Sequence, residues 1–351
     1  MVETLETAYG ASVTQQKMER NLLAWFQKFG RDLPWRRTVD PYTILVSEIM
    51  LQQTQVKTVL RYFSRWMEKF PGIEILAKAP EDAVLGLWQG LGYYSRARNL
   101  HRAAKILAQL PMFPKTPAEL KCLPGVGNYT AHAVVAFAFD ACVPVVDANT
   151  ARVLSRLFDY SRPVNTVTGI RDLREMAVSL LPIKGGGRLH NSAIMELGAL
   201  ICKPRKPLCF QCPLRVECRA RTPESRPVKR PHMLPQKVED HRAFLYDEES
   251  IWLIRSSERW WVGLWILPTL RRRPSGPCDC IVKFSITRHE VTMRIWRCAV
   301  LEEDRRKLQK VALRDLEQMA MPAPHRRGVA AMVEMLHTGI YDKSSELASF
   351  S

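Results

Sequence analysis

Two carboxylates of the chain lie in distinct local environments. Glu48 lies in an otherwise apolar helical segment, where burial would raise its pKa and keep it protonated near neutrality, as a general acid requires. Asp147 follows the apolar run at 143–146 and precedes a predicted helix start. Such a pair can cleave a glycosidic bond, because one group protonates the leaving group while the other stabilises the oxocarbenium ion. Each also has a structural alternative: a buried ion pair for Glu48 and a helix N-cap for Asp147.

Four cysteines lie close together in the carboxyl-terminal half. Cys202, Cys209, Cys212 and Cys218 are separated by six, two and five residues. Four thiolates in one compact loop are the ligand set that a 4Fe-4S cluster requires. Zinc is the alternative, but zinc sites with four cysteines usually pair two short knuckles across a longer spacer. We therefore expect the cluster.

Two further segments are suited to binding phosphate. Lys203, Arg205 and Lys206 lie between the first two cysteines and would project from a rigid loop, although a merely solvated basic loop is the alternative. The LPGVG run at 123–127 sits between two predicted helices. Its glycines would let the backbone approach a phosphate, and the amides of the next helix would point at the anion. A plain tight turn between helices is the alternative.

The segments that must position these residues are predicted to be helical as far as residue 222. Apolar residues recur at helical spacing over 15–29, and Gly30 follows as a stop. A capping box, Thr116 with Glu119 and Pro117 between them, begins the helix before the LPGVG run. Further helical patterns cover 42–70, 81–89, 96–110, 130–139, 150–157, 170–181 and 188–202. The glycine run at 185–187 has no strand before it and is predicted to be a loop.

Beyond residue 222 the pattern changes. Four prolines between 223 and 235 predict an extended linker over 223–240. Strand patterns at 243–246, 251–255 and 291–300, and a helix at 328–337, then predict a smaller α+β domain over 241–351. We thus expect a mainly α protein, with a helical domain over 1–222 joined to this smaller domain. Its cysteines, Cys278, Cys280 and Cys298, are expected to be buried thiols; a second metal site is the alternative, for which no fourth ligand is obvious.

Composition limits the class of protein. The 351 residues include 52 Lys and Arg against 35 Asp and Glu, a formal net charge of +17 that favours a polyanionic partner. The hydrophobic share of 46% and the charged share of 25% are ordinary for a globular protein. The best apolar run, 131–146, is interrupted by His132 and Asp140 and is too short for a membrane span. Residues 1–6 open acidic, unlike a secretory signal, so an intracellular location is expected, cytoplasmic or with the nucleoid in a bacterium.

The order of these pieces, from the Glu-bearing helix to the α+β region, resembles the MutY adenine DNA glycosylases of the helix-hairpin-helix superfamily. The resemblance is strong over about 15–222 and weaker over about 240–340. It rests on the cysteine loop and on the segments LPWR at 33–36, SEIMLQQT at 47–54, GLGYY at 90–94, LPGVG at 123–127 and MELGA at 195–199.

The resemblance implies an enzyme that acts on duplex DNA containing adenine opposite 8-oxoguanine or guanine, as a monomer with a 4Fe-4S cluster. The adenine is flipped out of the stack, because its glycosidic bond cannot be reached otherwise. Glu48 would protonate the five-membered ring of adenine and later activate water, and Asp147 would stabilise the oxocarbenium ion, with Tyr129 and Asn149 assisting. Gln53 would wedge into the gap around the lesion, together with Tyr93.

The resemblance also assigns binding residues. The implied adenine pocket comprises Arg31, Leu33, Trp35, Arg36 and Glu196. The implied DNA contacts are Gln52, Gln53, Thr54, Tyr93, Leu123, Gly125, Val126, Gly127, Lys203, Arg205 and Lys206. Taken singly, several of these residues also fit the core or a solvated surface.

In this family the carboxyl-terminal domain has a MutT-like fold and recognises 8-oxoguanine. The segment at 260–268 resembles the start of a Nudix motif, but TLRRRPSG at 269–276 replaces the Glu-rich metal-binding helix, so we expect no Nudix hydrolysis. The family's Phe-Ser-His loop is altered to FSITRH at 284–289. Aligning its histidine with His289 leaves Ser285 or Thr287 in place of the serine, with Arg288 beside them, as the implied lesion contacts.

Two alternatives remain. The endonuclease III type of the same superfamily removes oxidised pyrimidines and cleaves the strand through a lysine two residues after the second glycine of the hairpin. Tyr129 occupies that place, and Lys121 lies on the other side of the hairpin, so the imine route is closed and a monofunctional enzyme is predicted. A non-catalytic iron-sulfur DNA-binding protein is the alternative from a different class.

Overall fold

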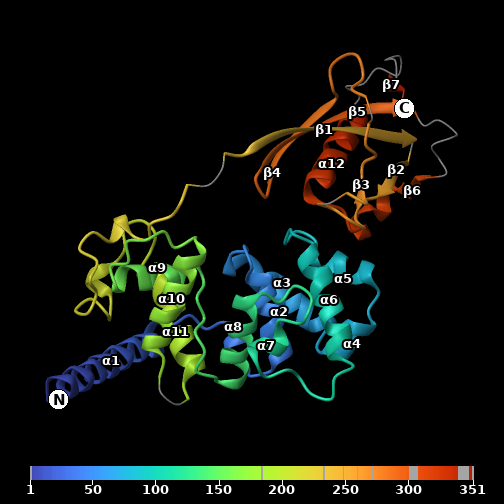
Figure 1. Cartoon of the computed structure of the whole chain (residues 1–351). Coiled ribbons are helices and arrows are strands. Elements are labelled where there is room, and N and C mark those ends of the chain that lie inside the picture. The colour runs from blue at the N-terminus through green and yellow to red at the C-terminus, as the bar shows by residue number, and fades with distance from the viewer. Residues whose placement is uncertain are drawn as a thin grey trace. The chain divides into compact units, whose positions relative to one another are not determined.

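The computed structural model describes residues 2–182, 185–231, 234–247, 249–258, 260–270, 272–299, 307–338 and 348–349. The chain divides into two compact units (Figure 1). The first unit comprises Met1–Lys78 and Asn99–Pro231, and the second comprises Ala79–Arg98 and His232–Ser351. The inclusion of Ala79–Arg98 in the second unit differs from the predicted division of the chain.

All regular elements described before residue 222 are helical, as predicted. They are α1 (Val2–Phe29), α2 (Pro41–Leu51), α3 (Val56–Lys69), α4 (Ile73–Lys78), α5 (Glu81–Trp88), α6 (Ser95–Leu107), α7 (Pro117–Leu120), α8 (Asn128–Phe139), α9 (Ala148–Leu157), α10 (Val167–Leu180) and α11 (Gly187–Leu200), with short 3-10 turns at Pro34–Arg36 and Cys209–Gln211. Among the residues that the structure describes, no helix combines the length and apolar character that crossing a membrane would need.

The predicted helix over 42–70 is wrong, because the structure divides it into α2 and α3. Gln52 ends α2 with a non-helical ψ of 112°, and Gln53 has a left-handed φ of 56°. A left-handed residue cannot continue an α-helix. The break places the turn at 52–55 beside the start of α8, where Gln52 Nε2 donates to Thr130 Oγ1 over 3.1 Å.

Two packed groups of helices build the first unit. Leu22 of α1, Leu154 of α9, Leu173 of α10 and Leu197 of α11 belong to one buried core. The other group is centred on α2, which packs beside α8 (Figure 1). Tyr42 and residues 44–50 of α2 are all buried. A helix that is apolar on all sides belongs in a core, so Glu48 is carried into the protein interior.

The second unit is built on a mixed seven-stranded sheet. Its described strands are β1 (Gln236–Asp247), β2 (Ser250–Arg255), β3 (Trp265–Ile266), β4 (Cys280–Ile286), β5 (His289–Ala299), β6 (Gln309–Ala312) and β7 (Ala348–Ser349). The order is β3-β2-β1-β5-β4, with β6 on β2 and β7 on β5. β1 pairs with β5 in parallel from Gln236↔His289 onward, so residues 236–240, predicted as linker, form part of a strand. The strands β3, β4, β6 and β7 were not predicted.

Successive residues of β1 and β5 bury opposite faces of the sheet. Phe244 and Ile295 belong to the core beneath α12 (Ala323–His337), whereas Leu245 and Trp296 belong to a core on the other face. Gly328 allows the close approach of α12, because a Cβ there would lie 2.4 Å from Cδ1 of Ile295. The chain therefore uses its period-two pattern to build two apolar layers.

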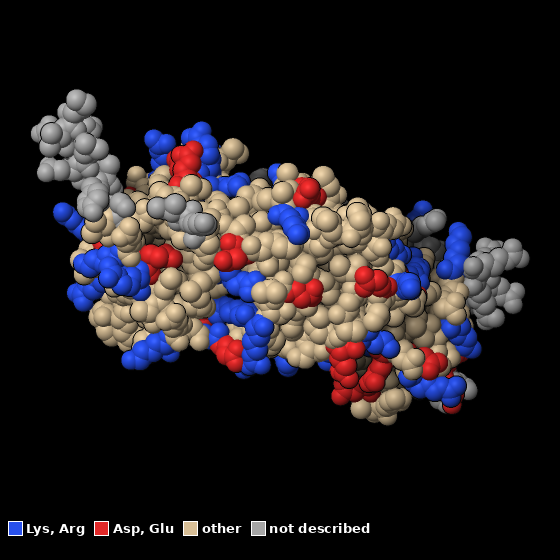
Figure 2. All heavy atoms as spheres, turned by 90° about the horizontal axis from the view of Figure 1, so that it is seen from below, with Lys and Arg blue, Asp and Glu red and all other residues tan. Residues whose placement is uncertain are grey.

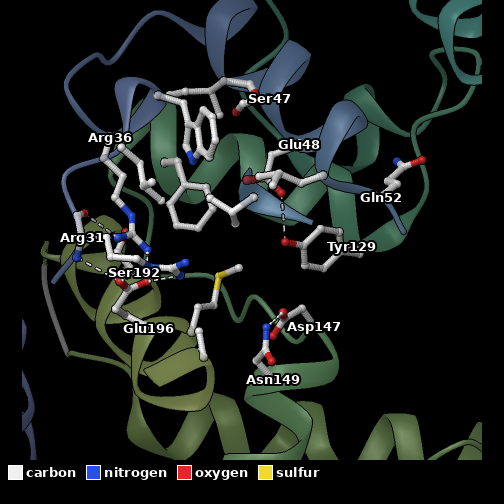
Figure 3. A pocket seen from close by; sticks show the side chains of 18 of the residues that line it. Arg31, Arg36, Ser47, Glu48, Gln52, Tyr129, Asp147, Asn149, Ser192 and Glu196 are labelled. Atoms are coloured by element: carbon white, nitrogen blue, oxygen red, sulfur yellow. Dashed lines mark hydrogen bonds and ion pairs between the residues drawn. The ribbon is translucent and has the colours of Figure 1, made fainter. Parts of the chain in front are cut away.

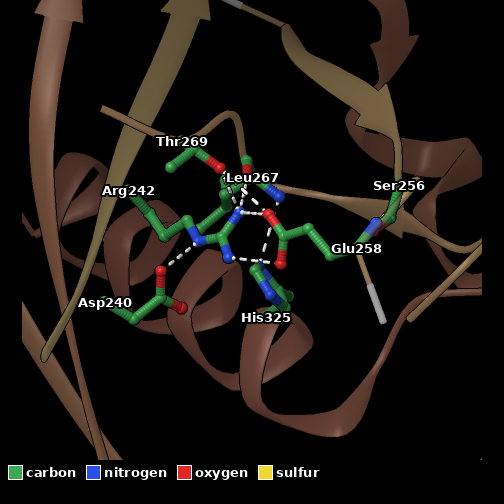
Figure 4. Close-up of polar contacts among 7 residues, drawn as sticks. All are labelled: Asp240, Arg242, Ser256, Glu258, Leu267, Thr269 and His325. Atoms are coloured by element: carbon green, nitrogen blue, oxygen red, sulfur yellow. Dashed lines mark hydrogen bonds and ion pairs between the residues drawn. The ribbon is translucent and has the colours of Figure 1, made fainter. Parts of the chain in front are cut away.

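A buried cation lies at the centre of a polar cluster in the second unit (Figure 4). Arg242 of β1 is 2% exposed; its Nε donates to Asp240 over 2.7 Å, and its two Nη atoms donate to Glu258 over 2.9 Å each. Nη1 also donates to Thr269 Oγ1 over 2.7 Å. A buried charge is tolerated only when it is paired in this way.

Candidate functional site

A cavity of about 770 Å³ opens in the first unit, between α2, α8, the start of α9 and α11. Figure 3 shows Glu48 and Tyr129 on one side of it and Asp147 with Asn149 on another. The predicted residues that line it are Arg31, Leu33, Trp35, Arg36, Glu48, Gln52, Gln53, Thr54, Tyr129, Asp147, Asn149 and Glu196. The two carboxylates predicted to act together thus face one cavity.

Glu48 is 3% exposed, and the hydroxyl of Tyr129 donates to its Oε2 over 2.9 Å. In the part of the chain that the structure describes, Glu48 forms no ion pair, so the alternative of a structural ion pair is not realised. Burial raises the pKa of Glu48 to about 7, and the nearby charge of Asp147 adds to that rise, while the bond from Tyr129 and the charge of Arg36 oppose it. A carboxyl with this pKa can both hold and release a proton near neutrality.

Asp147 serves as the N-cap of α9, its structural alternative, while also facing the cavity. Its Oδ1 accepts from the amide of Thr150 over 2.7 Å, and its Oδ2 accepts from Nδ2 of Asn149 over 2.9 Å. Both bonds fix the orientation of the carboxylate. The helix start thereby presents a carboxylate of fixed orientation to the cavity.

A further arginine holds the start of α9 against the end of α11. Nη2 of Arg152 donates to Oδ1 of Asn149 and to the carbonyl of Gly198, each over 2.8 Å, and its Nε donates to the carbonyl of Cys202 over 2.8 Å. Arg152 therefore links the residue beside Asp147 to the first cysteine of the loop. The sequence did not single out Arg152.

An ion cluster closes another side of the cavity. The carboxylate of Glu196, on α11, accepts from Nε and Nη2 of Arg31 over 2.7 and 2.9 Å, and from Nη2 of Arg36 over 2.8 Å. Burial acts to raise the pKa of Glu196, but these hydrogen bonds outweigh it and hold the pKa at about 2. Glu196 is therefore ionised, and it fixes the two guanidinium groups beside Leu33 and Trp35.

Several lining residues were missed by the sequence reasoning. Arg188, Ser192, Met195 and Ala199 line the cavity from the same face of α11 as Glu196. Their spacing of four, three and four residues is that of one helical face. Extending this periodicity from Glu196 in both directions would have found them.

The LPGVG hairpin connects α7 to α8. The capping box of α7 is present as predicted, with Thr116 Oγ1 accepting from the amide of Glu119. Gly125 has a left-handed φ of 76°, and a Cβ there would lie 2.5 Å from Cβ of Asn99. Gly127 is the N-cap of α8 and supplies no side-chain cap. Leu123 and Val126 are buried, so a DNA contact at either one would be through the backbone.

The four cysteines of the loop after α11 are free thiols that influence one another electrostatically. Burial raises the pKa of Cys212 to about 11, and the charges of Cys202, Cys218 and Cys209 raise it further. Among the described residues, no group of three or more His, Cys, Asp or Glu is arranged as a metal site, so the chemistry of the donor set is what bears on a cofactor. The donor set of four thiols in one loop fits an iron-sulfur cluster. Lys203, Arg205 and Lys206 are exposed on this loop.

The remaining predicted residues belong to the second unit. Tyr93 follows α5 in a loop, with a left-handed φ of 46° and 43% of its surface exposed. Thr287 and Arg288 form the two-residue turn between β4 and β5. Ser285 is exposed on β4, while the ring of His289 lies 5.1 Å from that of Trp260.

Comparisons with known proteins agree with this architecture. Residues 46–171 match the model of the HhH-GPD superfamily base excision DNA repair proteins. The chain is 35% identical over 269 residues to an adenine DNA glycosylase of Buchnera aphidicola subsp. Acyrthosiphon pisum, covering 74% of this chain and 76% of that protein. It is 44% identical over 213 residues to an adenine DNA glycosylase of Homo sapiens, covering 57% of this chain and 39% of that protein.

A solved structure of a thermostable thymine-DNA glycosylase is also similar, with a TM-score of 0.53 and 32% identity over 59% of this chain and 97% of that chain. The matched region spans between 39% and 57% of the length of four of the curated relatives.

Proposed function

Since this chain belongs to the HhH-GPD superfamily of base excision DNA repair proteins, and within it to the adenine DNA glycosylases, we propose that it is a monofunctional DNA glycosylase. Its proposed substrate is adenine opposite 8-oxoguanine or guanine in duplex DNA, and its reaction is hydrolysis of the N-glycosidic bond. The observation that carries this proposal is the buried carboxyl of Glu48, with a pKa of about 7, facing the same cavity as Asp147.

The proposed chemistry separates the work of the two carboxyl groups. The protonated form of Glu48 donates its proton to the five-membered ring of the flipped adenine, which makes the base a better leaving group. As the glycosidic bond breaks, positive charge develops on the sugar, and the anion of Asp147 stabilises it. Glu48, now ionised, accepts a proton from the attacking water. Asn149 holds Asp147 in place for this step.

The adenine pocket is assigned to the part of the cavity around Leu33 and Trp35. Their buried side chains offer an apolar wall for a planar base. The ring of Trp35 is itself fixed by an edge contact with Phe63, at a centroid distance of 5.2 Å. Arg31 and Arg36 supply hydrogen-bond donors at the edge of this wall, where Glu196 holds them.

We assign a 4Fe-4S cluster to Cys202, Cys209, Cys212 and Cys218. When bound, the cluster would cross-link the loop and hold its exposed lysine and arginine side chains in position. Arg156 binds the start of this loop and the chain that follows it, since its Nη1 donates to the carbonyl of Lys203 over 2.7 Å and its Nε to the carbonyl of Pro223 over 2.7 Å.

The proposed contacts to duplex DNA are the turn at 52–54, the hairpin at 123–127, Tyr93 and the basic residues of the cysteine loop. On the face seen in Figure 2, Lys and Arg are interspersed with Asp and Glu rather than gathered in one patch. Binding at these named segments, rather than by general charge alone, is part of the proposal. A DNA substrate also implies an intracellular location, and we expect a monomer.

For the second unit we propose a MutT-like role in recognising 8-oxoguanine. The turn between β4 and β5 presents Thr287 and Arg288 to solvent, with Ser285 exposed beside them. The hydroxyl of Thr287 lies 3.3 Å from Nδ1 of His289, so the two side chains offer adjacent polar groups to a base edge.

The deciding experiment is single-turnover base release from duplexes that carry adenine opposite 8-oxoguanine, guanine or thymine, and from a thymine-glycol duplex. We expect adenine release without strand scission. In Glu48→Gln, release should be lost while duplex binding is retained, and Glu68→Gln, exposed on α3, is the matched control. Unchanged release in Glu48→Gln would reject the mechanism. Thymine-glycol cleavage would instead indicate the endonuclease III type, and duplex binding with no release from any substrate would indicate a non-catalytic binding protein.

Iron analysis and absorbance near about 400 nm test the cofactor. A colourless preparation that contains zinc would reject the cluster.

A further inference from the structure

A second cavity, of about 400 Å³, lies in the first unit behind the proposed catalytic residues. Tyr129, Val146, Asp147 and Ala148 line both this cavity and the first one. A sugar held at Asp147 would therefore stand between two openings, one on each side of the carboxylate. The first cavity has the apolar wall suited to a base. The residues that line the second cavity therefore determine whether the rest of the nucleotide could bind there.

The polar lining of the second cavity is mainly cationic. His132, Arg174 and Lys229 line it, and Asp147 is the one acidic residue among the described lining residues. Both oxygens of Asp147 already accept hydrogen bonds, from the amide of Thr150 and from Asn149. The cavity therefore offers donors and positive charge to an occupant.

Arg174 is held in place by a neutral histidine. Burial lowers the pKa of His132, and the charges of Arg174 and Lys121 lower it further. The neutral ring is then able to donate from Nδ1 to the carbonyl of Asn128 over 2.7 Å while Nε2 accepts from Nη2 of Arg174 over 2.7 Å. In the described part of the chain, Arg174 forms no ion pair. Its charge is thus oriented at the cavity without being neutralised by a carboxylate.

Lys229 is carried to the rim by a segment whose backbone is fixed. The amide of Val164 donates to the carbonyl of Val228 over 2.9 Å. On the other side of Lys229, the side chain of Asn165 accepts from the amide of Arg230 over 2.8 Å and donates to its carbonyl over 3.1 Å. The two residues flanking Lys229 are therefore bound to one loop, which limits where its side chain can reach.

The start of α8 adds to the positive potential. Asn128, the first residue of this 12-residue helix, lines the cavity, and its N-cap, Gly127, provides no side-chain cap. The free amides at an uncapped helix start attract an anion.

We propose that this second cavity binds a phosphate group of the DNA strand that carries the target nucleotide, with Arg174 and Lys229 as its cationic ligands and His132 as the residue that positions Arg174. The base enters the first cavity, the sugar lies at Asp147, and an adjoining phosphodiester enters the second. This assignment rests on the proposed function and deepens it, because it accounts for the strand on either side of the base.

The test measures duplex binding against salt concentration in the Glu48→Gln background, so that no substrate is consumed. We expect Arg174→Met to weaken binding to the mismatched duplex by about tenfold at low salt, and to reduce the slope of log K against log salt by about one. The control is Arg171→Met on the same helix, whose side chain is exposed and pairs with Asp172 and Glu175. A slope that is unchanged, or reduced no more than in the control, would overturn the proposal.

A second variant covers the case in which Arg174→Met folds poorly. His132→Phe keeps the charge of Arg174 but removes the acceptor that orients it, so we expect a loss of affinity with little change in slope. Unaltered affinity in His132→Phe would overturn the positioning role. Duplex binding is also compared in inorganic phosphate and in chloride at equal ionic strength, to distinguish a DNA phosphate from free phosphate as the occupant of the site. If phosphate weakens duplex binding to the Glu48→Gln protein and not to its Arg174→Met derivative, the duplex and free phosphate compete for this site, as we expect. Phosphate that binds through Arg174 without changing duplex affinity would show that the site takes free phosphate only, and the assignment to the DNA strand would fail.

Failure of the site and failure of the proposed function give different results. Adenine release with an unchanged salt slope in Arg174→Met would reject the phosphate site and keep the glycosylase. A reduced slope in Arg174→Met, together with no base release by the protein that retains Glu48, would keep the site and reject the glycosylase.

Discussion

The hydroxyl of Tyr129, on the first turn of α8, donates to Oε2 of Glu48, in the middle of α2, over 2.9 Å. The contact joins the helix that follows the hairpin to the proposed general acid. It also places a phenol, which forms no imine, where the endonuclease III resemblance would require an amine. The bond favours the ionised form of Glu48, whereas burial favours the neutral form. The proton on Glu48 is thus set by two opposing effects, and the first three predictions separate them.

In the unmodified protein, base release should fall as the pH rises above about 7. Only protonated Glu48 can donate to the base, and its pKa is about 7, so the rate of the chemical step should drop about tenfold per pH unit beyond that point. Single-turnover rates over a pH series, with duplex binding measured at each pH, would check this. A rate that keeps increasing above pH 8 would contradict it.

Tyr129→Phe should move that decline to higher pH. Removing the hydroxyl removes the hydrogen bond that lowers the pKa of Glu48, so the pKa should rise. The same single-turnover series reports the shift. A decline that begins at lower pH than in the unmodified protein would show that Tyr129 acts on Glu48 in some other way.

Glu48→Gln should gain stability relative to the unmodified protein as the pH increases. The folded-state pKa of Glu48, about 7, lies above its ordinary value of 4.5, so the folded state binds the extra proton between these two pH values. Binding of this proton adds to the free energy of unfolding of the unmodified protein. The addition is complete below about pH 4.5 and is lost as the pH rises through about 7, a change on the order of 3 kcal/mol. Denaturant unfolding of both proteins at pH 5 and pH 8 measures the difference. A constant difference between them would argue against a raised pKa.

Arg152→Met should slow base release more than it weakens duplex binding. The variant loses the bonds to Asn149, Gly198 and Cys202, so the start of α9 and the carboxylate of Asp147 lose their fixed orientation. It also leaves buried acceptors unsatisfied, which costs about 2–4 kcal/mol of stability. Rates from pre-bound duplex, compared with affinities, distinguish the two effects. Equal losses in rate and affinity would indicate general unfolding.

Arg242→Met should destabilise the second unit by about 3–5 kcal/mol, because Asp240 and Glu258 would lose the buried cation between them. Trp261, whose ring lies 5.9 Å from the guanidinium carbon of Arg242, offers a fluorescence signal nearby. The matched control is Arg294→Met, which removes the more exposed pair with Glu239 and should change stability little. Similar losses in both variants would refute the role given to burial.

The helices around the cavity could be predicted because their information is local. The residues next to Glu48 in the sequence predict its apolar helix, and the residues next to Asp147 predict its N-cap position. Both carboxylates do line the cavity. The break at Gln53 could not be predicted, since a glutamine has no intrinsic preference for a left-handed φ and the turn is fixed by tertiary contacts such as Gln52 with Thr130. Arg152 was missed for the same reason: its partners lie three, 46 and 50 residues away.

The sheet shows the same limit. Covered and exposed positions alternate along β4, but the exposed position 281 carries an isoleucine, so the sequence itself does not alternate and the strand is not recognised without its partner β5. The first part of β1 directly follows a proline-rich sequence and is held in the sheet by parallel pairing with β5, a contact that no local pattern reveals.

Asp147 contributes to folding as well as to the proposed chemistry, because its carboxylate closes the first turn of α9. A change to alanine at this position would remove the carboxylate from the proposed reaction. It would also remove the N-cap of α9, at a cost of about 1 kcal/mol in stability. Asparagine would preserve the turn and abolish only the charge. A population of variants selected for solubility alone should therefore retain aspartate or asparagine here, and selection for repair should retain aspartate.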